Sequence, residues 1–191
     1  MKRVALLGGS FNPIHLGHIA LAQAVVEQQL ADEVWLVVSP QNPLKQTAEL
    51  LDERKRLFLV QKAVDGLAHI HVSEIEFLLP KPSYTWQTLE ALATQYPSFH
   101  FSLLIGGDNW ANFRKWARWE QILERYEIIV YPRVGSSMPS PLPQSVHLLE
   151  APLHEVSSTQ VREAIVHGAP LHTLLPACII EDCKAFYCHV K

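Results

Sequence analysis

The chain has 191 residues, of which 48% are hydrophobic and 18% are charged, and its formal net charge is −3. This composition is typical of a globular protein with one hydrophobic core, and it excludes disordered and fibrous proteins. Because the sequence has no long run of Lys or Arg, stable binding to nucleic acid is not expected. We therefore expect a single domain over residues 1–191.

The N-terminus, MKRVALLGGSF, has an apolar stretch too short for a signal peptide or a membrane-spanning helix. Cys178, Cys183 and Cys188 form no CxxC pair, and their odd number favours a reducing compartment. We expect a cytoplasmic protein with no membrane association, whose cysteines are buried or half-exposed apolar side chains. The sequence does not determine whether the chain forms a homo-oligomer.

Short aliphatic runs alternate along the chain with stretches of helical periodicity, the pattern of βα units around a parallel sheet. We therefore expect a doubly wound α/β domain with a mostly parallel sheet, which binds ligands beyond the carboxyl ends of its strands. The predicted strands are residues 3–7, 33–38, 70–72, 100–105, 127–131 and 146–149. The predicted helices are residues 16–30, 52–64 and 85–95, a helix that begins near residue 157, and a closing helix within residues 178–191, while residues 132–143 form an exposed loop.

Directly after the first predicted strand comes the segment GGSFNPIHLGH. Gly8 and Gly9 let the backbone approach a ligand, and the helix that follows presents unpaired N–H groups to an anion. His15 and His18 are three residues apart, so both can lie on one face of this helix. We expect their imidazoles to donate hydrogen bonds to phosphate oxygens that gain charge during phosphoryl or nucleotidyl transfer. The Walker A and GxGxxG motifs are absent.

A second candidate phosphate site is the segment SSTQVR. Ser157 and Gln160 have the spacing of a capping box, which predicts the N-terminus of a helix. Arg162 can reach back to the anion site that the free N–H groups and the hydroxyls of Ser158 and Thr159 create. Taken alone, an ordinary capped helix with a solvated arginine is the alternative.

Four segments together resemble a known family. GGSFNPIHLGH is similar to the HxGH signature GG[ST]F[DN]PxHxGH of the nucleotidyltransferase superfamily, and also to the HIGH motif of class I aminoacyl-tRNA synthetases. SSTQVR resembles the ISSTxIR element with which adenylyltransferases hold the ATP phosphates, whereas no KMSKS-like sequence occurs and the short chain leaves no space for an anticodon domain. SYTWQTL resembles the SYTxxTL element of nicotinate mononucleotide adenylyltransferases, and GGDN with the later Phe113 and Trp116 resembles their GxDxxxxFxxW region.

This resemblance implies a Rossmann-like nucleotidyltransferase fold, with a helical C-terminal part of about residues 157–191 packed on it. It implies transfer of AMP from ATP to nicotinate mononucleotide, giving nicotinate adenine dinucleotide and pyrophosphate in NAD biosynthesis. Mg²⁺ is expected to arrive with ATP, because no cluster of carboxylates suggests a metal site in the protein.

The resemblance also implies the residues of the active site. The catalytic residues would be His15, His18, Lys45 and Arg162. ATP would contact Gly8, Gly9, Ser10, Phe11, His15, His18, Gly106, Asp108, Ser157, Ser158, Thr159 and Arg162. Nicotinate mononucleotide would contact Ser10, Asn12, Lys45, Tyr84, Thr85, Trp116 and Ala117.

Chemistry suggests how the acceptor base would be held. An indole face suits a planar, electron-poor pyridinium ring, and main-chain N–H groups suit its carboxylate, so Trp116 and the turn at Thr85 are the candidates. Simple packing of Trp116, and N-capping by Asp108, are the alternatives. A nearby charge such as Arg118 would help to separate nicotinate from nicotinamide.

One departure from the family concerns the loop after the second strand. The family commonly has a PxxxPPHK-like loop, whereas this chain reads SPQNPLK, with Leu44 in place of the histidine and Lys45 retained. Nicotinamide mononucleotide, phosphopantetheine and glycerol phosphate remain alternative acceptors. A non-catalytic nucleotide-binding regulator with the same fold is the alternative outside the enzymes.

Overall fold

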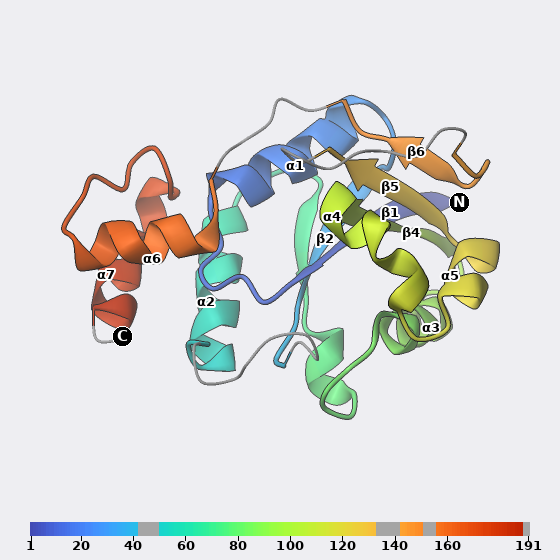
Figure 1. Cartoon of the computed structure of the whole chain (residues 1–191), viewed down its shortest axis with the longest axis horizontal. Helices are drawn as coiled ribbons and strands as arrows, with labels where there is room; N and C mark the ends of the chain where they lie inside the picture. The colour runs from blue at the N-terminus through green and yellow to red at the C-terminus, as the bar shows by residue number, and fades with distance from the viewer. Residues whose placement is uncertain (42–49, 133–141, 151–155, 189–191) are drawn as a thin grey trace.

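The computed structural model describes residues 1–41, 50–132, 142–150 and 156–188. Its centre is a six-stranded sheet in the order β3-β2-β1-β4-β5-β6 (Figure 1). The strands are β1 (Lys2–Gly9), β2 (Glu33–Val38), β3 (Ile70–Ser73), β4 (Phe99–Gly106), β5 (Glu127–Tyr131) and β6 (Val146–Leu148). All neighbouring strands pair in parallel, so the predicted α/β class is confirmed and the sheet is parallel throughout.

Two strands extend beyond their predicted ends because glycines continue the pairing. Gly8 and Gly9 of β1 pair with Val37 and Val38 of β2, and Gly106 of β4 pairs with a residue of β5. Gly8, Gly9 and Gly106 of the two predicted ligand segments are therefore the last residues of their strands, whereas Gly107 begins α4.

The helices match the sequence pattern where they are long. They are α1 (Leu16–Glu27), α2 (Glu53–Val64), α3 (Thr85–Gln95), α4 (Gly107–Ala111), α5 (Trp119–Arg125), α6 (Ser158–Val166) and α7 (Ile180–Tyr187), with 3₁₀ turns η2 (Ile75–Leu78), η3 (Phe113–Lys115) and η4 (Ala177–Ile179). Helix α1 ends before the predicted Leu30, because Gln29 takes a left-handed φ of 55°. The short helices α4 and α5 were not predicted.

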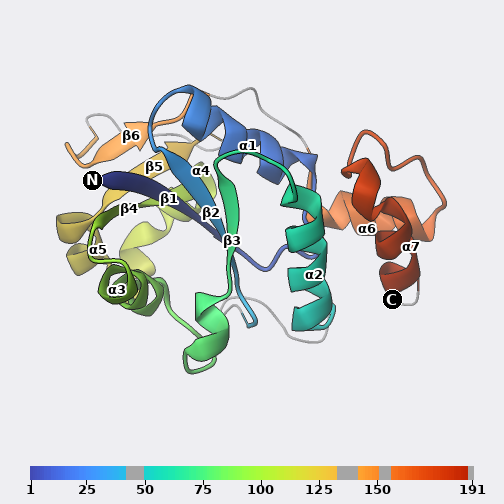
Figure 2. The same cartoon turned by 180° about the vertical axis from the view of Figure 1, so that it is seen from behind.

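Helices cover both faces of the sheet, as Figures 1 and 2 show. Alternate residues of β1 point to opposite faces: Ala5 and Leu7 pack in a cluster with residues of α1 and α2, and Val4 and Leu6 pack with residues of α3 and α5. This is the two-sided burial expected of a parallel sheet. The predicted doubly wound arrangement is thus formed by two apolar layers.

The C-terminal helices α6 and α7 lie beyond α1 and α2, at the opposite end of the molecule from β6 (Figures 1 and 2). Buried side chains of this part, including Val161, Leu175 and Tyr187, belong to the same apolar cluster as residues of α1 and α2. An ion pair of 2.7 Å between Lys62 Nζ and Asp182 Oδ2 adds a polar contact between α2 and α7.

The cysteines differ from the expectation. Cys183 is buried, but Cys178 and Cys188 are exposed. From Cys183 in α7 to Cys188 at its end, a step of five residues rotates the position by roughly 140° beyond one full turn, so these two do not share a buried face, and Cys178 lies before this helix, in η4. Burial raises the pKa of the Cys183 thiol to about 12.

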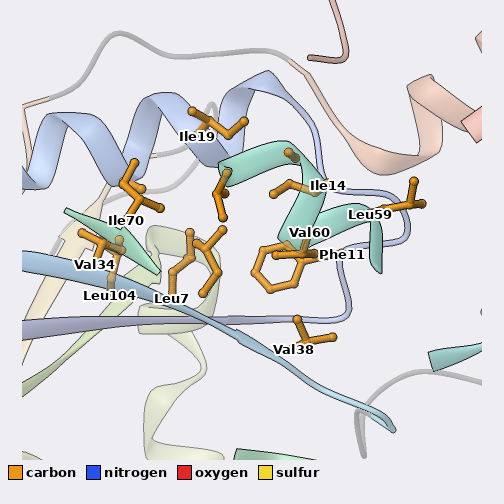
Figure 3. Packing of buried hydrophobic residues seen from close by; sticks show 14 of the residues in the cluster. Leu7, Phe11, Ile14, Ile19, Val34, Val38, Leu59, Val60, Ile70 and Leu104 are labelled. Carbon is orange, nitrogen blue, oxygen red and sulfur yellow. The ribbon is translucent and has the colours of Figure 1, made fainter. Parts of the chain in front are cut away.

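The loop after β1 is anchored in the apolar core. Figure 3 shows Phe11 and Ile14 among core side chains that include Val60 of α2. Phe11 is 2% exposed and Ile14 is fully buried. The loop that carries the first predicted phosphate motif is therefore fixed by hydrophobic packing as well as by its backbone.

Within the described residues, we find no helix that is long and apolar enough to cross a membrane. The cytoplasmic location stays a prediction, and the oligomeric state stays undecided.

Candidate active site

The loop between β1 and α1 follows an unusual backbone path. Phe11 has a φ of 44°, in the left-handed region that residues other than glycine seldom adopt. A Cβ atom at Gly9 would lie 3.1 Å from the Phe11 ring, which is too close for an ordinary contact. The missing side chain of Gly9 therefore makes room for the Phe11 ring in this turn. This role adds to the close approach of a ligand that we expected from the sequence.

His15 and His18 lie side by side at the start of α1. Their rings stack with centroids 3.7 Å apart and an angle of 30° between the planes. The main-chain N–H of His15 donates to Nδ1 of His18 at 3.2 Å, so a neutral His18 carries its proton on Nε2. His15 is 6% exposed and His18 is more exposed. His18 is thus the histidine of the pair that is more accessible to a phosphate.

The second predicted phosphate motif lies directly against this loop. Nη1 of Arg162 donates to the carbonyl oxygen of Asn12 at 2.8 Å, across 150 residues of sequence. The hydroxyl of Ser158 donates to the carbonyl oxygen of Pro13 at 2.9 Å. Nη2 of Arg162 donates to Thr159 Oγ1 at 3.3 Å, which aligns the guanidinium along the start of α6. The fold therefore joins the two predicted phosphate motifs into one surface.

These hydrogen bonds limit what the hydroxyls can offer a ligand. The Ser158 hydroxyl gives its only proton to the loop, so it presents lone pairs elsewhere. Ser157 forms the predicted capping box, accepting from Gln160 N at 3.2 Å while its own N–H donates to Gln160 Oε1 at 2.7 Å. Ser157 and Ser158 thus hold α6 in place, and their part in ATP binding stays a prediction.

The N-terminus of α1 is less open than the sequence suggested. The N–H of Leu16 donates to the carbonyl oxygen of Leu174 at 2.9 Å. This bond satisfies one of the donors that a helix leaves unpaired in its first turn. The C-terminal segment therefore covers part of the helix end that we expected to face a phosphate.

A cavity of about 240 Å³ lies at the carboxyl ends of β1 and β4, beside the first turn of α3. In the strand order β3-β2-β1-β4-β5-β6, the order reverses between β1 and β4, and ligands of doubly wound sheets bind at such a point. The predicted site residues that line the cavity are Gly8, Gly9, Gly106, Tyr84, Thr85, Trp116 and Ala117. The lining residues not predicted as site residues include Ser39, Glu76, Ser83, Thr88, Asn109 and Lys115.

Trp116 has both of the roles considered for it. It lines the cavity, and it packs against Phe113 with ring centroids 5.4 Å apart. Arg118 stacks on Trp86, with its guanidinium carbon 3.7 Å from the ring centroid, and lies outside the cavity lining. The cation among the lining residues is Lys115, whose Nζ donates to Asn112 Oδ1 at 2.8 Å.

A buried carboxylate forms part of the cavity wall. Glu76 is 8% exposed and accepts hydrogen bonds from Ser83 Oγ at 2.7 Å and from Thr88 Oγ1 at 2.8 Å. Both hydroxyls therefore direct their protons to Glu76 and present lone pairs to the cavity. Sequence analysis missed this group, because the two donors lie 7 and 12 residues away, outside any local motif.

Three further predicted contact residues are buried and do not line the cavity. Ser10, Phe11 and Asn12 are 4%, 2% and 4% exposed. Asn12 Oδ1 accepts from the N–H of Leu51 at 3.1 Å and from the hydroxyl of Tyr187 at 2.9 Å. Any contact of this segment with a substrate would therefore come mainly from its main chain.

Arg56 and Tyr187 are further polar side chains near this loop that sequence analysis missed. Arg56 is 1% exposed and donates to main-chain carbonyl oxygens of the loops after β1 and β2. Burial lowers the pKa of Arg56 and raises that of Tyr187. The signal for Arg56 was present: with Val60 and Ala63, it occupies the apolar stripe of α2.

The remaining predicted residues of this group are Asp108 and Lys45. Asp108 is exposed in the first turn of α4 and is not its N-cap, which is Gly106. Lys45, together with Leu44, lies outside the described residues, and so does most of the predicted exposed loop at residues 132–143. No group of three or more His, Cys, Asp or Glu side chains that could hold a metal ion occurs in the described part of the chain.

Comparisons with known proteins show the family of this chain. A model of the cytidylyltransferase-like family matches residues 6–164. The probable nicotinate-nucleotide adenylyltransferase of Bacteroides fragilis is 45% identical over 174 residues, which cover 91% of this chain and 87% of that protein. The corresponding protein of Flavobacterium johnsoniae is 41% identical over 190 residues, covering 97% of this chain and 98% of that protein.

The fold is also that of a solved enzyme. The structure of Plasmodium falciparum nicotinic acid mononucleotide adenylyltransferase complexed with NaAD has a TM-score of 0.78 and 16% sequence identity, covering 97% of this chain and 98% of that chain. At this identity, the likeness shows the fold alone, whereas the bacterial relatives show the family. With the joined phosphate motifs and the cavity at the switch point, they place the chain in the nicotinate-nucleotide adenylyltransferases, within the cytidylyltransferase-like family.

Proposed function

We propose that this chain transfers AMP from ATP to nicotinate mononucleotide, giving nicotinate adenine dinucleotide and pyrophosphate. The observation that carries the proposal is the bond from Arg162 to the loop of His15 and His18, next to the cavity at the strand-order reversal. It creates an anion site and a base site within one crevice. The names of the bacterial relatives indicate the same acceptor.

The two substrates would occupy different parts of the crevice. The ATP phosphates would lie at the junction of the β1 loop and α6, near His18 and Arg162. The acceptor base would enter the cavity, where the Trp116 face can stack on the ring. Its carboxylate would face the first turn of α3 and the charge of Lys115, because first-turn N–H groups and a cation both favour an anion. Drug-sized ligands fill pockets of roughly 300–1,000 Å³, so this cavity suits the base and part of the ribose.

The reaction is a direct in-line displacement. An oxygen of the 5′-phosphate of nicotinate mononucleotide forms a bond to the α-phosphorus of ATP, and the bond from that phosphorus to the bridging oxygen breaks. Pyrophosphate leaves with the electron pair of the broken bond. Because the acceptor phosphate is already ionised near neutral pH, the step needs no general base.

Catalysis therefore depends on positioning and on stabilisation of charge. His18 donates from Nε2 and Arg162 from its remaining N–H groups to the phosphate oxygens. Lys45, predicted from the sequence, would add a further cation. Mg²⁺ would enter with ATP and neutralise phosphate charge.

The first test measures pyrophosphate release from MgATP with nicotinate mononucleotide and nicotinamide mononucleotide as parallel acceptors. We expect a strong preference for the acid, and we expect His18→Ala to lower kcat by about 10²–10³-fold, the loss found when one donor to a developing charge is removed. His100→Ala, an exposed histidine at the far end of β4, is the matched control and should retain normal turnover. Near-normal turnover of His18→Ala at saturating substrate would refute the mechanism.

The same assay separates the alternatives. Preference for nicotinamide mononucleotide would keep the mechanism and change the acceptor. No pyrophosphate release with either acceptor, despite ATP binding, would point to another phosphate acceptor or to a non-catalytic regulator.

A further inference from the structure

Arg56 is the largest fully buried side chain of the molecule as described, although it carries a charge. It lies on α2, on the face that packs toward the sheet, with 1% of its surface exposed. A buried guanidinium loses its hydration and must be compensated by hydrogen bonds. Its partners therefore indicate why it is there.

The four acceptors of Arg56 are main-chain carbonyl oxygens from three segments. Nε donates to Leu51 at 2.8 Å, Nη1 to Ser39 at 2.9 Å and to Ser10, and Nη2 to Pro40 at 2.8 Å. Ser10 belongs to the loop after β1, and Ser39 and Pro40 follow β2. One planar fork thus holds together the chain at the carboxyl ends of two neighbouring strands.

Both loops bear on the proposed active site. Ser39 lines the acceptor cavity, and Ser10 lies directly before the turn that leads to His15 and His18. The peptide bond between Ser10 and Phe11 is trans, so its C=O and N–H point in opposite directions. When Arg56 binds the Ser10 carbonyl, it directs the Phe11 N–H away from α2. Arg56 also helps to hold Phe11 at its φ of 44°, a conformation that persists only where its surroundings enforce it.

We propose that Arg56 is a positioning residue for the transfer reaction: its guanidinium fixes the loop after β1 relative to the loop after β2, and so aligns the ATP and acceptor sites. This inference rests on the proposed function. It assigns the role to the fork geometry and not to charge alone, because the acceptors are neutral carbonyls that converge from several directions.

The decisive variants are Arg56→Lys and Arg56→Met. Lysine keeps the charge but offers a single nitrogen, which cannot span the four carbonyls, and methionine removes both charge and donors. We expect kcat/KM of Arg56→Lys to fall at least tenfold, with a higher KM for both substrates. The matched control is Arg54→Lys on the same helix, whose exposed Nη1 lies 3.5 Å from Glu74 Oε2, and it should keep wild-type kinetics.

Hydrogen exchange gives a readout that does not depend on turnover. In the wild-type chain, the amides of residues 8–12 and 38–39 should be protected, and in Arg56→Lys they should exchange faster while β4 and α3 keep their protection; Pro13 and Pro40 have no amide N–H. The proposal is overturned if those amides are unprotected in the wild type, if folded Arg56→Lys has wild-type kcat/KM, or if exchange accelerates equally throughout the chain. If Arg56→Met does not fold, the kinetics of Arg56→Lys and the amide hydrogen exchange of the wild type still test the proposal.

The two proposals can fail separately. Absence of pyrophosphate release by the wild type would refute the proposed function, whereas the protection of the two loops would still test the role of Arg56.

Discussion

Glu76 determines the polarity of one wall of the acceptor cavity. Because Ser83 and Thr88 donate their protons to its two carboxylate oxygens, both hydroxyls can only accept from a ligand. A ligand group on this wall is therefore favoured if it is a donor, such as a ribose hydroxyl, and disfavoured if it is a carboxylate. In the proposed complex, the nicotinate carboxylate would face Lys115 and the main-chain N–H groups at the turn of Thr85, and not the hydroxyls of Ser83 and Thr88.

We predict that Glu76→Gln raises KM for the acceptor about tenfold, equivalent to about 1.4 kcal/mol, with little change in KM for ATP. The amide can accept on only one of its two arms, so one hydroxyl must reorient and the start of α3 loses a fixed contact. Steady-state kinetics with each substrate varied will measure this. Glu90→Gln, the same change at an exposed ion pair of α3 with Arg125, is the control. Equal changes in both KM values would contradict the prediction.

The buried thiol of Cys183 links stability to alkaline pH. Burial raises its pKa from 9.0 to about 12, so between these values the unfolded chain loses the proton while the folded chain keeps it. The unfolded state then gains stability as pH rises, at up to about 1.4 kcal/mol per pH unit. We predict that the free energy of unfolding falls less steeply above pH 9 in Cys183→Ala than in the wild type. Urea unfolding at several pH values will test this, with Cys188→Ala as the exposed control.

At the scale of elements, three helices from distant parts of the sequence hold one loop. Helix α2 supplies Arg56, α6 supplies Arg162, and α7 supplies Tyr187, whose hydroxyl donates to Asn12 Oδ1 at 2.9 Å. Arg56 and Arg162 bind main-chain carbonyl oxygens of the loop, whereas Tyr187 binds a side chain. The closing helix α7 is therefore connected to the candidate active site through a side chain, although it lines no part of the cavity.

We predict that Tyr187→Phe lowers Tm by about 2–4 °C, because it removes one buried hydrogen bond worth about 1 kcal/mol. It should also lower kcat several-fold, since Asn12 Oδ1 then loses the hydrogen bond from the Tyr187 hydroxyl that helps to fix the loop. Tyr96→Phe, at a half-buried position with a 3.4 Å hydrogen bond, is the control. A loss of stability with unchanged kcat would show that α7 supports the fold only.

At the scale of the whole molecule, we propose that residues 1–191 form a single domain. Val161, Leu175 and Tyr187 of the C-terminal part share one apolar cluster with residues of α1 and α2. The ion pair between Lys62 and Asp182 joins α2 to α7 as well. An interface of this kind favours unfolding as one unit.

We predict one cooperative unfolding transition. The five tryptophans all precede residue 120, so their fluorescence reports on the sheet part, whereas far-UV circular dichroism also reports on α6 and α7. The two signals should give the same midpoint in urea. A separate, earlier transition in circular dichroism, or loss of amide protection confined to α7, would instead indicate an independent C-terminal unit.

The sequence by itself determined the features that depend on neighbouring residues. Strands β2 and β5 and helix α3 have their predicted bounds, because aliphatic runs and helical periodicity are local signals. The capping box of Ser157 and Gln160 formed as predicted for the same reason. The motifs around His15 and Arg162 were also visible, since each is a contiguous segment. Short helices such as α4 and α5 contain too few turns for periodicity to reveal them.

Only the tertiary structure decided which groups meet and which remain for a ligand. Arg56 could be noticed as a charge on an apolar stripe, but its four carbonyl partners come from segments up to 46 residues away. The sequence could not show that Ser158 gives its proton to Pro13, or that Leu174 covers the N–H of Leu16. The physical reason is that each N–H or O–H proton serves one acceptor. The packing of elements far apart in the sequence decides which acceptor lies within reach.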